Sequence, residues 1–274
     1  MGGMKLDPAP LSTEVWWVRT SAADDRLLRL LDEEERSRNA RFRLQADRDR
    51  HLLGRAVSRL LLAERADCPP EKVTFALRCR SCEEKERTGA SRGGDSGQGP
   101  HGKPHPSGPA EGWEVSVSHS GEWVVLALAR EVPVGVDVER VSPARDLEGL
   151  AGYTLGGPEQ QAWERLSPAD RVGAFFRYWA RKEALLKATG LGLSGGMRRV
   201  LVSPADAAPE LLSWEGGGAP EAVALADLEV GAAPDRDGEE YSSALAALTD
   251  RPLELEPRTH EETVRLLRSR PGGG

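Results

Sequence analysis

Residues 134–139 read Val134-Gly135-Val136-Asp137-Val138-Glu139, and this alternation of apolar and acidic side chains predicts a β-strand. In an extended strand the three valines face one side, and Asp137 and Glu139 face the other. The Cα atoms of alternate strand residues lie about 6.6 Å apart, so two such carboxylates repel each other unless a cation lies between them. Two interpretations remain open: an amphipathic strand with a solvated acidic face, or one side of a metal site.

A long helix is predicted over residues 169–189, ended by Gly190. One face of this helix is apolar except for a single acidic residue, and it consists of Val172, Phe176, Trp179, Glu183 and Leu186. Because a carboxylate removed from water is costly without a partner, Glu183 needs a cation, a metal or a proton. Lys187, four residues on, can supply a surface ion pair. Alternatively, Glu183 joins the two strand carboxylates in an all-oxygen site, which favours magnesium over zinc.

The composition excludes several classes of protein. Of the 274 residues, 39% are hydrophobic and 30% are charged, an ordinary balance for a globular chain. The net charge of −7 argues against a general nucleic-acid binder. No apolar run approaches the roughly 18 residues that a membrane helix needs. We therefore expect a cytoplasmic protein with neither nucleic acid nor membrane as a partner.

Arginine and cysteine each leave two interpretations open. Eight arginines crowd one N-terminal stretch: Arg36, Arg38, Arg41, Arg43, Arg48, Arg50, Arg55 and Arg59. They predict either a solvated helix face balanced by neighbouring acids, or a surface that binds phosphate through guanidinium groups. Cys79 and Cys82 have the spacing of zinc ligands, and His101 and His105 could complete such a site. No second ligand pair follows at the usual spacing, however.

Strand-like and helix-like stretches are mixed without a regular βαβ period, which favours an α+β fold with two similar halves. The first half is residues 1–133, with a long Gly/Pro-rich loop at 87–112, and the second is residues 134–250. Residues 251–274 form a polar tail with a possible short helix at 260–268. Further strands are predicted at 15–19, 73–77, 113–118, 123–129, 198–202, 222–228 and 241–248.

Four fragments occur in a fixed order along the chain. They are His101-Gly102-Lys103-Pro104, then Val115-Ser116-Val117-Ser118-His119-Ser120-Gly121, then the acidic strand, then Phe176-x-x-Trp179-x-x-Lys182-Glu183-Ala184-x-x-Lys187-x-x-Gly190. The series resembles 4'-phosphopantetheinyl transferases of the surfactin-synthetase-activating type, in the variant whose last motif reads W-x-x-K-E-A. The resemblance covers about residues 14–248.

The resemblance implies a monomer built as a pseudo-dimer of two α/β halves, with the active site in the cleft between them. It implies an enzyme that transfers the 4'-phosphopantetheine of coenzyme A to a serine of an apo acyl or peptidyl carrier protein. Magnesium would assist and 3',5'-ADP would be released, in fatty acid, polyketide or nonribosomal peptide biosynthesis.

The resemblance also assigns roles to residues. It gives the magnesium to Asp137, Glu139 and Glu183, and it gives catalysis to Glu183 and Lys187. Contacts with the coenzyme fall to Arg38, Arg41, Arg50, Lys103, Pro104, Ser118, His119 and Lys187. The base is either Glu183 or a metal-bound water. A non-catalytic coenzyme-binding or carrier-binding protein and a zinc-containing nucleic-acid module remain as rival interpretations.

Overall fold

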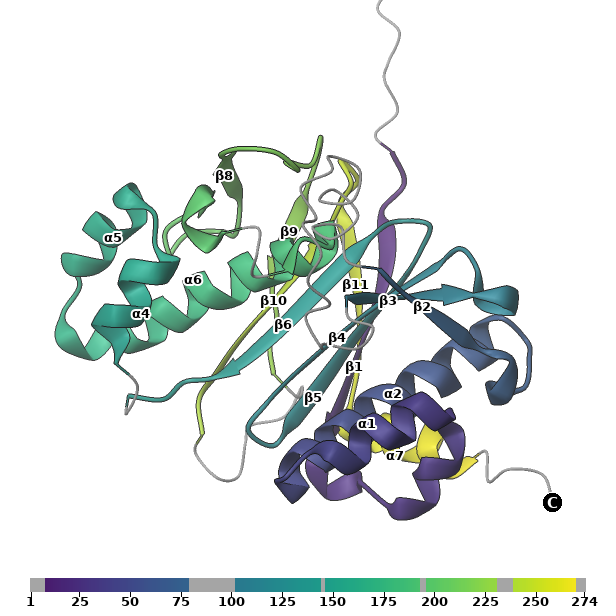
Figure 1. The fold of residues 1–274 in the computed structure, drawn as a ribbon. Coiled ribbons are helices and arrows are strands. Elements are labelled where there is room, and N and C mark those ends of the chain that lie inside the picture. Colours follow the sequence, from purple (N-terminus) through teal and green to yellow (C-terminus); the bar gives the residue numbers. More distant parts are fainter. Residues whose placement is uncertain (1–7, 79–101, 144–145, 193–195, 231–238, 270–274) are drawn as a thin grey trace, which may run out of the picture.

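Two β-sheets, each backed by one long helix, form the body of the protein (Figure 1). The computed structural model describes residues 8–78, 102–143, 146–192, 196–230 and 239–269. Within these ranges, none of the helices combines the length and the apolar character that crossing a membrane requires. The mixture of helices and strands agrees with the mixed composition of the α+β fold expected from the sequence.

The first sheet has the strand order β11–β1–β5–β4, and helix α2 packs against one of its faces (Figure 1). Its strands are β1 (Leu11–Arg19), β4 (Trp113–Ser120), β5 (Trp123–Arg130) and β11 (Leu253–Arg258). Its helices are α1 (Glu33–Arg41), α2 (Gln45–Arg65) and α7 (His260–Ser269). An apolar stripe of α2 faces the sheet, and Leu53, Ala56 and Leu60 are fully buried there. Burial of each such leucine contributes about 1.5–3 kcal/mol.

The second sheet has the order β6–β10–β9 and packs against α6. Its elements are β6 (Val134–Arg140), β9 (Ala224–Asp227), β10 (Tyr241–Ala247) and α6 (Pro168–Thr189). The side chain of Ser167 caps the start of α6, and Gly190 ends it at φ 73°, a left-handed conformation that suits glycine. Gly135 lets β6 approach α6 closely, because a Cβ there would collide with the carbonyl oxygen of Ala184. The predicted strand and long helix are thus confirmed.

Shorter elements cover the outer side of α6. They are α4 (Leu147–Thr154), α5 (Gly157–Glu164), the short helix Met197–Arg199, β7 (Val200–Val202) and β8 (Leu211–Trp214). Lys182 ties several of them to α6, since its buried ammonium donates to the carbonyl oxygens of Thr154 (2.8 Å) and Met197 (3.1 Å) and pairs with Glu159. Lys182 therefore supports the fold, although it belongs to the W-x-x-K-E-A fragment.

The two sheets meet through a third apolar cluster. The three valines of β6, Val134, Val136 and Val138, are fully buried there with residues of β1, β5 and β10. Asp137 and Glu139 consequently face away from this cluster, as the alternation predicts.

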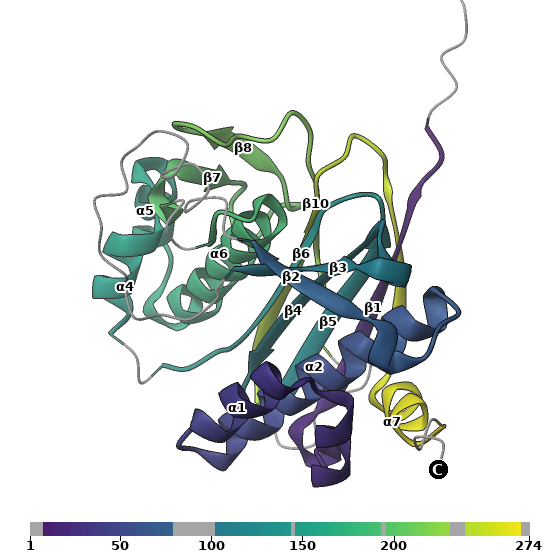
Figure 2. The ribbon, with the colours of Figure 1, turned by 45° about the vertical axis from the view of Figure 1, so that its right-hand side comes forward.

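Three segments differ from the sequence prediction. Of the strand predicted at 198–202 only Val200–Val202 is extended, because Met197–Arg199 form a short helix. Residues 103–107, inside the predicted loop, form strand β3 (Lys103–Ser107), which pairs with β2 (Thr74–Arg78). Its prolines hide the strand signal, and they are tolerated because this ribbon has only two strands. In the predicted polar tail, β11 pairs in parallel with β1, and α7 lies beside α2 (Figure 2). The hydroxyl of Thr263 donates to the carbonyl oxygen of Trp17 (2.7 Å), so this segment is part of the first sheet's layer.

Candidate functional site

Three predicted site residues meet where β4, β6 and α6 converge. The ammonium of Lys187 lies 2.7 Å from Asp137 Oδ1 and 2.8 Å from the hydroxyl of Ser118, which in turn donates to Asp137 Oδ1 at 2.8 Å. Asp137 is only 2% exposed, so the interpretation of β6 as a strand with a solvated acidic face is wrong at this position. Burial raises the pKa of Asp137, while Lys187 and Ser118 act in the opposite direction.

Glu183 occupies the same region from α6. It is 9% exposed, and its Oε1 atom is buried without a hydrogen-bond partner. Its pKa is raised to about 7, chiefly by burial; Lys187 opposes the rise, and the charges of Asp137 and Glu139 contribute to it. The three predicted carboxylates are therefore close enough to influence one another electrostatically. The ammonium of Lys187 donates its hydrogen bonds to residues of β4 and β6. Lys187 is therefore not simply the partner of Glu183 in a surface ion pair.

Glu139 lines a polar cavity of about 370 Å³ at the end of β4. Its Oε2 atom accepts a hydrogen bond from Ser120 (2.9 Å). The cavity is lined by Arg50, His119, Ser120, Gly121, Glu122, Glu139 and Arg140. Two more predicted residues, Arg50 and His119, are thus brought next to a predicted metal ligand.

Two hydrogen-bond donors of this cavity are Arg50, which is positively charged, and His119, which is neutral. Arg50 Nε donates to the carbonyl oxygen of Gly121 (2.9 Å), and its Nη1 pairs with Asp47 (2.7 Å). His119 lines the same cavity and is an exposed residue, yet the surrounding protein disfavours the charged form of its ring. This desolvation, followed by the charges of Lys187 and Arg50, lowers the pKa of His119. The imidazole is therefore neutral at neutral pH and can donate a single N–H.

His51 is a residue of this region that sequence reasoning missed. Its Nε2 atom is buried without a partner, and its Nδ1 lies 3.2 Å from the amide nitrogen of Asn39. Burial, followed by the charges of Arg55, Arg38 and His119, lowers its pKa to about 4. His51 therefore belongs to the same positive field as His119. A lone histidine in an arginine-rich helix has no motif that would have indicated this.

The remaining predicted coenzyme residues lie elsewhere. Lys103 is ion-paired with Glu114 (2.8 Å), which precedes Ser118 by four residues and so lies about 13 Å away along β4. Pro104 is paired opposite Leu77 in the β2–β3 ribbon. Arg38 and Arg41 are exposed in α1. In the arginine stretch, Arg59 is buried and pairs with Glu35 (2.6 Å), so it serves the fold.

The zinc interpretation gains no support from the described residues. Cys79, Cys82 and His101 lie outside them, and His105 Nδ1 faces Glu114 Oε1 at 3.7 Å. Within the described ranges, no group of three or more His, Cys, Asp or Glu side chains is arranged to hold a metal ion. At Asp137 the positive charge is supplied by Lys187.

The donor atoms nevertheless fit a hard cation. Asp137 Oδ2 and Glu183 Oε1 are buried carboxylate oxygens without a hydrogen-bond partner. Leaving such atoms unpaired is costly, and an all-oxygen set is what magnesium prefers. Asp137 and Glu183, with Glu139 beside them, are thus chemically suited to bind a divalent cation.

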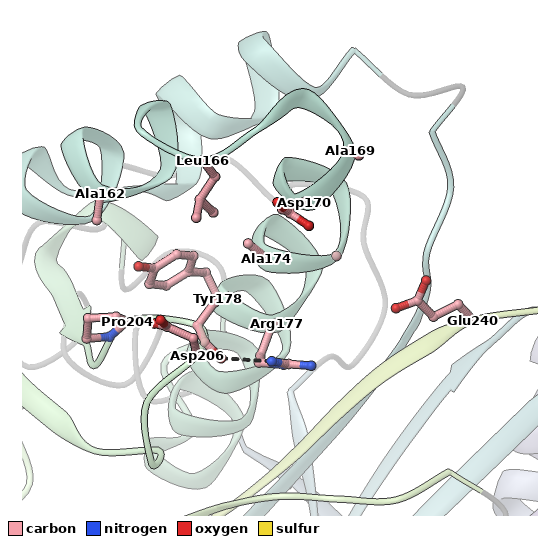
Figure 3. Close-up of a pocket in the computed structure, with 12 residues that line it drawn as sticks. Ala162, Leu166, Ala169, Asp170, Ala174, Arg177, Tyr178, Pro204, Asp206 and Glu240 are labelled. Carbon is pink, nitrogen blue, oxygen red and sulfur yellow. Dashed lines mark hydrogen bonds between the residues drawn. The ribbon is translucent and has the colours of Figure 1, made fainter.

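A second, larger cavity of about 490 Å³ lies between α5, the first half of α6 and the loop after β7 (Figure 3). Small side chains form much of its lining, and its carboxylates Asp170, Asp206 and Glu240 are exposed. Arg177 Nη1 donates to the carbonyl oxygen of Ala205 (2.8 Å). This cavity contains none of the predicted site residues, so size alone does not identify the functional site.

Comparisons with known proteins match the part of the chain that contains β6 and α6. Residues 133–246 match the model of the 4'-phosphopantetheinyl transferase superfamily. A Synechocystis protein named as a 4'-phosphopantetheinyl transferase is 32% identical over 174 residues, covering 63% of this chain and 62% of that protein. A Thraustochytrium phosphopantetheinyl transferase is 31% identical over 208 residues, covering 69% and 65%. The 4'-phosphopantetheinyl transferase psf-1 of Bacillus pumilus is 35% identical over 166 residues, covering 60% of each chain.

The chain spans about three fifths of the length of these relatives. The part that matches the superfamily model contains Asp137, Glu139, Glu183 and Lys187. The cavity residues Arg50 and His119 lie outside it.

Proposed function

We propose that this chain is a 4'-phosphopantetheinyl transferase of the surfactin-synthetase-activating type, which moves the phosphopantetheine arm of coenzyme A onto a serine of a carrier protein. One observation carries the proposal: within the part that matches the superfamily model, Asp137 and Glu183 are buried together with unpartnered oxygens, beside Lys187. Buried, unpaired carboxylates are expensive for a fold and mark sites that bind a charged ligand.

The architecture supports the same proposal. Each half consists of a sheet backed by one long helix, α2 of 21 residues and α6 of 22, as a pseudo-dimer would. The edge strands β4 and β6 lie side by side where the halves meet, and the candidate site is at this junction. We propose that the protein acts as a monomer in the cytoplasm, and that its partners are acyl or peptidyl carrier domains.

Asp137, Glu139 and Glu183 would hold magnesium, which when bound would neutralise negative charge on the diphosphate of the coenzyme. Lys187 is the residue proposed to bind a diphosphate oxygen, because its ammonium carries three donors and its side chain is 26% exposed. Arg50 and His119 would bind phosphate from the polar cavity, with Arg38 and Arg41 adding positive potential nearby.

Three proposed coenzyme residues are constrained by their present contacts. Lys103 would have to leave Glu114 to reach the coenzyme, and Pro104 would move with it. Ser118 already uses its hydroxyl to donate to Asp137 and to accept from Lys187, so its contribution would be to hold these two side chains.

Glu183 is the proposed base. Its pKa of about 7 is that of the site without a bound cation, and a carboxylate with this pKa can accept a proton near neutral pH. The hydroxyl oxygen of the carrier serine would form a bond to the phosphorus that bears the pantetheine, and the bond from that phosphorus to 3',5'-ADP would break. The hydroxyl proton would pass to Glu183. The charge on the leaving diphosphate oxygen would be stabilised by Lys187.

Intact-mass spectrometry of an apo carrier tests the proposal. Incubated with this chain, coenzyme A and magnesium, the carrier should gain the mass of one phosphopantetheine. Glu183→Gln should abolish the gain, whereas Glu148→Gln, which alters an exposed glutamate in α4, should not. An unmodified carrier with the wild-type chain would refute the function. Near-normal turnover by Glu183→Gln would refute the assignment of the site.

A further inference from the structure

Three serine hydroxyls join the two halves of the protein. In the described chain, β4 is the edge strand of the first sheet and β6 is the edge strand of the second, and the two lie side by side. Ser116, Ser118 and Ser120 occupy alternate positions of β4, so their side chains share one face of the strand. All three make hydrogen bonds to β6. We refer to these residues as the seam serines.

Each seam serine binds a different part of β6. The hydroxyl of Ser116 accepts from the backbone N–H of Val136 at 3.0 Å, and within the described residues it makes no hydrogen bond to a carboxylate. The hydroxyl of Ser118 donates to Asp137 Oδ1 at 2.8 Å. Ser116 therefore serves the backbone register, while Ser118 serves a candidate metal ligand that Lys187 also holds.

Ser120 does both tasks at once. Its hydroxyl donates to Glu139 Oε2 at 2.9 Å and accepts from the backbone N–H of Arg140 at 3.0 Å. The second bond fixes the hydroxyl relative to the β6 backbone, and the first then fixes the carboxylate of Glu139. A glutamate side chain has three rotatable bonds, so such an anchor restricts where its carboxylate lies.

We propose that Ser120 is a positioning residue that orients Glu139 for binding a divalent cation. The inference rests on the proposed function, in which Glu139 is a metal ligand. Residues that hydrogen-bond to a metal ligand set its orientation, and their loss weakens metal affinity by about 10–100-fold. Ser120 lies outside residues 133–246, so the first half of the chain orients a ligand that the second half supplies.

Binding of Mn²⁺ to the full chain without coenzyme tests this role directly, measured from the electron paramagnetic resonance signal of the free ion. Ser120→Ala should raise the dissociation constant by about 10-fold. Ser120→Thr, which keeps the hydroxyl, should bind nearly as wild type. In the transfer assay, Ser120→Ala should raise the half-saturating magnesium concentration much more than it lowers the rate at saturating magnesium.

Ser116→Ala is the matched control, because it removes a seam hydroxyl that touches only backbone. It should lower thermal stability but leave Mn²⁺ affinity within about twofold, since no carboxylate is released. If Ser120→Ala does not fold, Ser120→Cys replaces the hydroxyl with a weaker donor of similar shape and should give a smaller loss in the same direction.

The inference is overturned if Ser120→Ala binds Mn²⁺ like the wild type, if Ser116→Ala loses as much affinity, or if the wild-type chain binds no Mn²⁺. These results are distinct from failure of the proposed function. A wild-type chain that binds Mn²⁺ but leaves carriers unmodified refutes the transferase, and the dependence of Mn²⁺ affinity on Ser120 would still support its positioning role.

Discussion

The raised pKa of Glu183 predicts that replacing this residue makes the protein more stable. In the unfolded chain a glutamate has its ordinary pKa of 4.5, whereas in the folded chain the pKa of Glu183 is about 7. The folded state therefore holds a proton that the unfolded state has lost as the pH rises from 4.5 to 7, and stability falls over that window. Glu183→Gln removes this ionisation, so the variant should be more stable than the wild type above pH 7.

The magnitude follows from the size of the shift. A difference of about 2.5 pKa units lowers the free energy of unfolding of the wild type by about 3 kcal/mol at pH 8. At pH 5.5, which lies in the lower part of the interval between the two pKa values, the loss is about 1 kcal/mol. For a chain of this size, 3 kcal/mol raises the melting temperature by roughly 5–10 °C. The gain should thus be large at pH 8 and small at pH 5.5.

Thermal unfolding in a chelating buffer, followed by differential scanning fluorimetry at the two pH values, measures this difference. Magnesium added at pH 8 should then stabilise the wild type and leave the variant unchanged, because only the wild type keeps the charged ligand. A variant that melts at or below the wild-type temperature at pH 8, or a gain equal at both pH values, would refute the reasoning. Glu148→Gln controls for the loss of one negative charge at an exposed position.

Three further changes test other parts of the structure. Gly135→Ala should destabilise by about 3 kcal/mol, because its Cβ would collide with the backbone of α6, while Gly152→Ala in open space should not; melting temperatures of both decide this. Lys182→Met should lower the free energy of unfolding by about 3–5 kcal/mol, since it leaves the buried carboxylate of Glu159 without its cation. The double variant with Glu159→Gln should recover part of this stability, as measured by urea unfolding. Arg50→Ala should raise the KM for coenzyme A by about 10-fold with a smaller change in kcat, since it removes a charged donor from the polar cavity; unchanged KM in steady-state kinetics would exclude Arg50 from binding.

Elements with strong local signals could be predicted from the sequence. The helix α6 has a serine cap, an apolar face and a terminal glycine, and β6 alternates regularly. The strand β3 was missed because Pro104 and Pro106 lack the N–H groups that strands normally use. The strand β11 was missed because its partner β1 lies more than two hundred residues earlier, and no local pattern encodes that pairing.

The same distinction applies to the site. Asp137, Glu183 and Lys187 stand in recognisable fragments, and the fold places them close together. The roles of His51 and Ser120 depend on where α2 and β4 lie relative to each other and to β6, which only the folded chain determines. Lys103 belongs to a recognisable fragment, but its partner Glu114 holds it away from Ser118.

The parallel pairing of β11 with β1 has a consequence for synthesis of the protein on the ribosome. Residues 253–258 emerge after all strands of the second sheet, so that sheet can close while β1 still has an open edge. During that interval Trp17 also lacks its contact with Thr263. The sheet whose first strand is translated earliest is therefore the last to be completed, and the nascent chain is vulnerable to mispairing at β1 until α7 has left the exit tunnel.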